Sequence, residues 1–157
     1  MHLLHQKLTT FWTSALQTAL ETERIHSKGH RDITSWRQRL FVILANQMGV
    51  LQIELTNSKL PIFPDLKSLA AYLGINYDGS LDIYLGSYAI YWDTMLRDKN
   101  RKPDFNDPFD LRHLRYLRVT DNDQILVTSD NGLYNLCQRV ASGRVIKTNE
   151  FIARFKN

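Results

Sequence analysis

Apolar residues recur at helical spacing through the first half of the chain. In residues 3–20 they follow intervals of three, four and one, which predicts an amphipathic helix that ends near Gly29. Asp32 then has the character of an N-cap. After it, a second helix that ends near Gly49 is predicted by residues that lie on one side of it, namely Ile33, Trp36, Leu40, Ile43, Leu44 and Gln47.

Two further helices are predicted before residue 100. Asp65 follows a proline and begins a short apolar pattern that stops at Gly74. A longer helix begins near Leu81, with Asp78 or Ser80 as its cap. Its tyrosines, tryptophan and aliphatic residues cover more than half of its circumference, so we expect it to be the central helix of the core.

The next segment contains a helix and then a strand. Asp107 as N-cap, followed by Pro108 at the first helical position, predicts a helix that runs to about Arg118. Residues 124–128 form a short apolar run rich in β-branched residues and bounded by turn signals. This run is typical of a buried strand.

The remaining residues predict a helix, a strand and a final helix. Asp130 caps a helix that runs to about Ala141, and Val145–Ile146 forms a second short strand. Thr148 or Asn149 then caps a terminal helix. Strand, helix and strand within about 30 residues require a parallel crossover.

The composition fits one folded domain. The chain has 157 residues, of which 43% are hydrophobic and 23% charged, and such a chain buries a substantial core. We expect an α/β fold that is mostly helical with a small parallel β-sheet. The single domain, residues 1–157, comprises a helical part, residues 1–100, and a βαβ part, residues 104–157.

The net charge and the cysteine content indicate which binding partners and which cellular compartment suit the protein. A net charge of +4 and a pI near 9.3 favour polyanionic partners. The single cysteine, Cys137, excludes an intramolecular disulfide and a cysteine-based zinc site, and its helical spacing to leucines places it in the core. Because no long apolar run is present, we expect a cytoplasmic protein with no membrane association.

A basic connector precedes the most acidic segment. Arg97, Lys99, Arg101 and Lys102 bring four cations into six residues. They form either an ordinary solvated loop or a loop that faces phosphate groups. On the second interpretation these four residues are candidates for nucleic-acid binding.

Two aspartates from separate segments are expected to converge. Functional groups of a parallel sheet gather at the carboxyl ends of its strands, and Asp130 lies two residues after Thr128. Asp107 begins a helix that approaches the same edge. Such oxygen ligands suit Mg²⁺ or Mn²⁺, which assist phosphodiester hydrolysis. Without any metal, capping and the helix dipole account for Asp107 and Asp110, and capping accounts for Asp130; for the residues alone this is the favoured interpretation. A lone histidine such as His113 is usually packed or solvated.

Residues 104–155 resemble the end of a PIN-like domain, a family of metal-dependent ribonucleases. The resemblance rests on the segments NDPFDLRHLRYL, ILVTSD and VIKTNEFI, which begin at residues 106, 125 and 145. They correspond to an Asn-Asp that opens a helix, a strand that closes in Val-Thr-x-Asp, and a last strand that leads into a Thr-x-Glu-Phe helix.

The resemblance implies a site and an activity. Asp107 and Asp130 match the two late metal-binding acids, and Asp110 matches an extra acid of the variant with a helix histidine and tyrosine, here His113 and Tyr116. Thr128 matches a small hydroxyl residue beside the site. The implied protein cleaves single-stranded RNA with Mg²⁺ or Mn²⁺, as a toxin or an RNA-processing factor. Its metal ligands are Asp107, Asp110 and Asp130, and its catalytic set adds His113 and Thr128.

One departure from the family keeps other functions open. The family opens with a strand that ends in an aspartate, and no such strand begins this chain; Glu54, or less directly Asp93 or Asp104, stands as a substitute. A second hypothesis is therefore an impaired or split module that binds RNA or a protein partner, such as an antitoxin. A third is a helical interaction protein unrelated to nucleic acid, which forms a homo-oligomer.

Overall fold

The computed structural model describes residues 18, 21–22, 32–47, 49, 61–98, 100–104, 106–118 and 123–156. The predicted helix of residues 3–20 lies almost wholly outside these ranges, and so does Glu54. None of the helices in the described ranges is long and apolar enough to cross a membrane.

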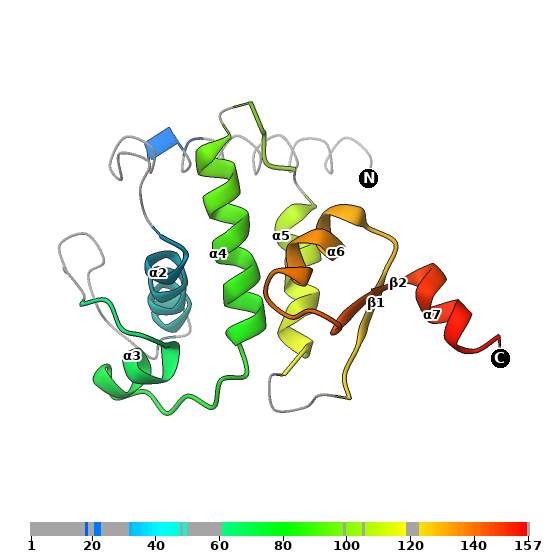
Figure 1. Ribbon diagram of the computed structural model, residues 1–157. Helices are drawn as coiled ribbons and strands as arrows, with labels where there is room; N and C mark the ends of the chain where they lie inside the picture. Colours follow the sequence, from blue (N-terminus) through cyan, green and yellow to red (C-terminus); the bar gives the residue numbers. More distant parts are fainter. Residues whose placement is uncertain are drawn as a thin grey trace, which may run out of the picture.

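A central helix, α4 (Asp82–Arg97), separates two groups of elements, as the sequence pattern predicts (Figure 1). On one side lie α2 (Ile33–Gln47) and α3 (Leu66–Tyr72). The other side holds the remaining elements: α5 (Asp107–Arg112), the 3₁₀ helix η1 (His113–Tyr116), β1 (Leu126–Thr128), α6 (Asn131–Gln138), β2 (Val145–Lys147) and α7 (Thr148–Arg154).

Apolar side chains pack against both sides of α4. Leu85 belongs to one cluster with Phe41 and Val42 of α2 and with leucines of α3. Ala89 and Met95 belong to a second cluster, which joins α4 to α5, η1, α6 and β2. A helix that is buried on opposite sides must be apolar around most of its circumference. This explains the aromatic and aliphatic pattern of residues 81–96.

Aspartate side chains cap several helices. The Asp32 carboxylate accepts a hydrogen bond from Ser35 N at 2.7 Å, and Asp65 accepts one from Ser68 N at 2.7 Å. These bonds satisfy amide groups that the first turn leaves unpaired. The prediction for α4 was wrong, because Leu81 precedes that helix and provides no side-chain cap.

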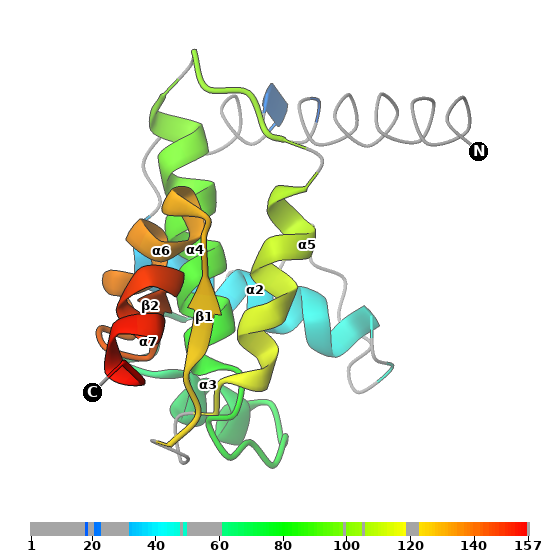
Figure 2. The same ribbon diagram turned by 90° about the vertical axis from the view of Figure 1, so that its right-hand side faces the viewer.

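The two strands form a parallel sheet in which Val127 pairs with Ile146, and α6 is the crossover between them. This confirms the predicted crossover. The prediction of a buried first strand was wrong for its outer face, since Ile125 is 42% exposed and Val127 36%. Strand β1 lies at the front of the molecule in Figure 2, whereas Val145 of β2 is buried.

Two predicted helix boundaries were also wrong. The terminal helix α7 begins at Thr148 itself, and Lys147 precedes it without a side-chain cap. The helix predicted to reach Arg118 ends at Arg112 and continues as η1. The cause is the spacing of three buried leucines at intervals of three residues, because a 3₁₀ helix has three residues per turn and keeps such positions in line. They are Leu111, Leu114 and Leu117.

Candidate functional site

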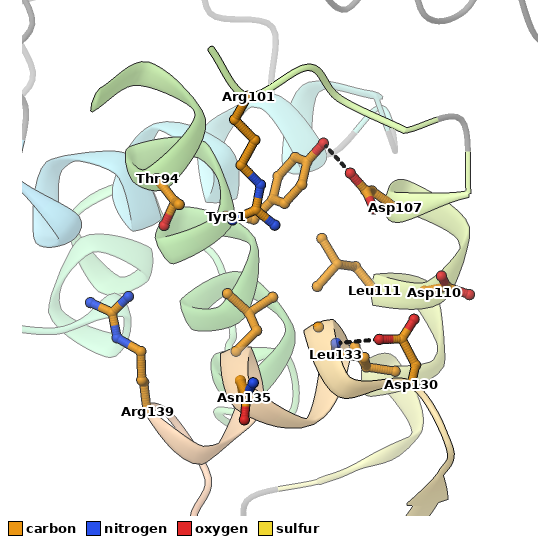
Figure 3. Close-up of a pocket in the computed structure, with 12 residues that line it drawn as sticks. Tyr91, Thr94, Arg101, Asp107, Asp110, Leu111, Asp130, Leu133, Asn135 and Arg139 are labelled. Carbon is orange, nitrogen blue, oxygen red and sulfur yellow. Dashed lines mark hydrogen bonds between the residues drawn. The ribbon is translucent and has the colours of Figure 1, made fainter. Parts of the chain in front are cut away.

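A pocket of about 430 Å³ lies between α4, α5 and α6 (Figure 3). We name it the acid pocket because three of its lining residues are the aspartates that the sequence brought forward. Asp107 and Asp110 come from α5, and Asp130 immediately precedes α6. The expected convergence of these acids is therefore present. The lining of the acid pocket also includes Tyr91, Arg101, Asn135 and Arg139, which are discussed below.

Asp107 is held by tertiary contacts and does not cap its own helix. It is the first residue of α5, and Asn106 occupies the cap position. Its Oδ2 accepts hydrogen bonds from Tyr91 Oη at 3.0 Å and from Asp104 N at 3.0 Å. Burial and the nearby Asp107 charge both raise the pKa of Tyr91, so this hydroxyl stays a donor at neutral pH. The prediction that Asp107 is the N-cap of α5 was wrong, because its carboxylate binds the Tyr91 hydroxyl of α4 instead of the amides of its own helix.

Asp130 combines a local role with its place at the acid pocket. Its Oδ1 accepts a hydrogen bond from Leu133 N at 2.9 Å, so it caps α6 as the sequence predicts. Its own amide donates to Thr128 Oγ1 at 3.0 Å. Thr128 therefore shapes the turn between β1 and α6, and its hydroxyl is not among the groups that line the acid pocket.

Asp110 shows that the three carboxylates influence one another. Partial burial raises its pKa, and the charges of Asp130 and Asp107 raise it further; His113 has a smaller opposite effect. A carboxylate beside like charges binds its proton more tightly, because a second or third negative charge in one place is unfavourable. The acid pocket is thus a site where positive charge would stabilise the protein.

The acid pocket has a basic part as well. Arg101 enters it near Tyr91, and Arg139 lies on the side away from the aspartates (Figure 3). Arg101 was among the predicted cations, but Arg139 was missed. The available signal was spacing: Asn135 and Arg139 are four residues apart in and just after α6 and share one polar face with the capped end.

The other predicted residues lie elsewhere. Arg97 forms an ion pair with Asp93 at 2.9 Å, which leaves Asp93 unsuited to replace the missing family acid. Lys99 lies outside the described residues, and Lys102 is exposed and away from the acid pocket. His113 is exposed on η1 and lines a different hollow.

Asp104 lies beside the aspartates of the acid pocket. Its amide binds Asp107, its charge adds to the raised pKa of Asp110, and its Oδ1 accepts from Asn106 N at 2.9 Å. Within the described ranges, however, no three acidic, histidine or cysteine side chains stand in position to hold a metal ion together.

Comparison with protein-family models, with curated proteins and with solved structures finds no match for this chain. The resemblance of residues 104–155 to PIN-like domains therefore stays a prediction. The structure establishes the fold class, a mostly helical protein with a small parallel sheet.

Proposed function

We propose that the protein is a metal-dependent ribonuclease of the PIN-like type, which cleaves single-stranded RNA with Mg²⁺ or Mn²⁺. The observation that carries the proposal is that Asp107, Asp110 and Asp130 line one pocket, where burial and then the charges of Asp130 and Asp107 raise the pKa of Asp110. A hard divalent cation bound by these oxygens would offset the repulsion between those charges. The chemistry of the donors therefore fits Mg²⁺ or Mn²⁺.

The hydrogen bonds of the site leave oxygens for such an ion. Asp107 uses Oδ2 toward Tyr91 and Asp104, and Asp130 uses Oδ1 toward Leu133. The second oxygen of each carboxylate can then serve as a ligand, while the hydrogen bonds restrict its rotation. A bound divalent ion supplies the positive charge that stabilises the leaving oxygen in phosphodiester hydrolysis.

The arginines of the acid pocket complement the acids. Arg101 and Arg139 present guanidinium groups, which bind phosphate oxygens through paired N–H donors. An ion held by the aspartates would act together with Arg101 and with Arg139 on the opposite side, so one pocket would offer positive charge to both the scissile phosphate and its neighbour. Positioning of this kind contributes much of the rate enhancement of phosphoryl chemistry.

The direct test compares two N-cap aspartates. Asp130→Asn removes the charge and keeps a good capping residue, since asparagine and aspartate cap helices about equally well. Asp65→Asn makes the same change at α3, away from the acid pocket. With fluorescent single-stranded RNA and increasing Mg²⁺ or Mn²⁺, we expect Asp130→Asn to lower kcat/KM by on the order of 100-fold or more. Asp65→Asn should cleave like the parent, and equal cleavage by the parent and Asp130→Asn would remove the hypothesis.

A second function is a PIN-derived module that binds RNA or a protein partner without cutting. It is favoured by one observation, namely that the guanidinium groups of Arg101 and Arg139, which can bind phosphate without a metal, line the acid pocket. On this hypothesis RNA binds with salt-sensitive affinity, as for any protein that neutralises phosphates. No metal-dependent turnover accompanies it, and robust cleavage by the isolated chain excludes it. Binding of an antitoxin-like partner would leave this second function as the better account.

A further inference from the structure

A second hollow of about 690 Å³ follows the outer surface of α5 and η1, where it meets the start of α4 at Ser80 and Leu81. We name it the arginine groove. None of the residues that line it in the described part of the chain is acidic. Besides Ser80 and Leu81, it is lined by Phe109, Arg112, His113, Arg115, Tyr116 and Arg118.

The arginine groove arises from a three-residue repeat. Residues 110–118 read DLRHLRYLR, in which every leucine is followed by an arginine. The leucines are buried beneath η1, and this burial turns the arginines to the solvent side. Where the chain is a 3₁₀ helix, residues three apart lie in line and about 6 Å from one another along the axis. Arg112 ends α5, Arg115 lies in η1 and Arg118 follows it, and all three residues are exposed.

The residue that precedes each leucine of the repeat connects the arginine groove to the acid pocket. These residues are Asp110, His113 and Tyr116. Asp110 lines the acid pocket, whereas His113 and Tyr116 line the arginine groove. Side chains of the same segment, α5 and η1, therefore line both sites.

In the part of the chain that the structure describes, ion pairs with acids do not neutralise the arginines of the groove. No carboxylate in the described ranges is within ion-pair distance of Arg112, Arg115 or Arg118. Arg112 instead lies 5.0 Å from the centre of the Phe109 ring, and Arg115 lies 5.7 Å from that of Tyr84. Cation–π contacts orient a guanidinium group without removing its charge.

Aromatic rings are exposed beside these charges. Tyr116 is 77% exposed and Phe109 is 42% exposed. Proteins that bind single strands combine a positively charged groove with aromatic side chains on which unpaired bases stack. A peptide of aspartate and glutamate alone would satisfy the arginines but has no flat ring for Tyr116, and a duplex keeps its bases stacked on one another.

We propose that the arginine groove binds a single strand of RNA. Arg112, Arg115 and Arg118 hold successive phosphates, and the Tyr116 ring stacks on a base. The strand then passes His113 and delivers its next phosphate toward Asp110 in the acid pocket. The direction toward cleavage rests on the proposed ribonuclease activity, but the binding itself does not.

Binding is measured without any metal, so that it stays separate from cleavage. A 5′-labelled, 12-nucleotide RNA is titrated with the full chain in EDTA at several salt concentrations, with fluorescence anisotropy as the signal. The triple variant Arg112→Gln, Arg115→Gln, Arg118→Gln should weaken binding more than tenfold at low salt. It should also reduce the slope of log K against log salt by about 2, because each phosphate contact to a single strand contributes about 0.7.

Matched variants separate this surface from general charge. Lys67→Gln, Arg154→Gln and Lys156→Gln remove three exposed cations elsewhere and should leave the slope unchanged. Tyr116→Ala should weaken binding on the order of tenfold with an unchanged slope, because stacking carries no counterion effect. Tyr116→Phe keeps the ring and should bind like the parent.

Several results would overturn the proposal. These are no binding by the parent, an equal slope for the parent and the arginine triple variant, or tighter binding of the same sequence as a duplex. Displacement of the RNA by polyglutamate as readily as by unlabelled RNA would also overturn it. A parent that binds in EDTA through the arginine groove but never cleaves with Mn²⁺ would support the inference and remove only the ribonuclease activity.

Discussion

Gly86 of α4 packs tightly against Val140, which follows α6, and its replacement by alanine tests that packing. A Cβ added at Gly86 would lie 2.9 Å from Val140 Cγ1 and 3.7 Å from Cγ2. The first distance is shorter than side-chain carbons tolerate. Valine is stiff at χ1, so it cannot easily rotate away. We therefore expect Gly86→Ala to move α4 away from the segment that follows α6, the helix that Asp130 of the acid pocket caps.

Two opposing terms set the size of the effect. Alanine in place of glycine inside a helix stabilises by about 1 kcal/mol, whereas overpacking a core contact costs about 1–3 kcal/mol. The expected net loss for Gly86→Ala is about 1 kcal/mol. Val140→Ala alone should cost about 1 kcal/mol, since it removes two methyl groups from a half-buried position. In the double variant the added methyl group fills the space that valine vacates, so the total loss should stay under about 0.5 kcal/mol.

The double-mutant cycle is measured by urea unfolding at 25 °C with far-UV circular dichroism. The expected coupling between the two sites is about 1.5–2 kcal/mol in favour of the double variant. Additive effects, within about 0.3 kcal/mol, would refute the contact between Gly86 and Val140. A stabilised Gly86→Ala variant would do the same, because only the helix-propensity term would then operate.

Asp110→Asn should stabilise the protein at pH 7 by about 0.5 kcal/mol, the size of an exposed and screened charge interaction. Because the pKa of Asp110 is raised, the folded state binds the proton of this carboxyl more tightly than the unfolded state does. The stability that this proton provides is complete below the pKa of the unfolded state, near 3.8. It is lost as pH rises through the pKa of the folded state. The gain from Asp110→Asn should therefore vanish at pH 3, and equal gains in thermal unfolding at both pH values would contradict this. Cys137 is fully buried, and burial raises the pKa of its thiol to about 11, so a disulfide reagent should modify it on the order of 100-fold faster in urea than in the native protein at pH 7; rapid native labelling would contradict its burial.

Local patterns in the sequence predicted the features that depend on neighbouring residues. The caps by Asp32, Asp65 and Asp130 followed from an aspartate placed before an apolar helical pattern, because a cap joins groups only three residues apart. The parallel crossover from Thr128 to Val145 followed in the same way, since the spacing of strand, helix and strand leaves few other arrangements. The approach of Asp107 to Asp130 followed from the rule for strand ends.

The tertiary structure alone decided the features that depend on contacts between distant segments. The partner of Asp107 is the hydroxyl of Tyr91, sixteen residues earlier on α4, and no local pattern distinguishes that hydroxyl from a core tyrosine. Arg139 reaches the acid pocket only because α6 packs against α4. Arg115 faces the solvent because its neighbour Leu114 on η1 is buried in the core. Short-range hydrogen bonds and periodic burial can be inferred from a sequence, but the side chains that face one another across a core depend on packing that only the folded chain specifies.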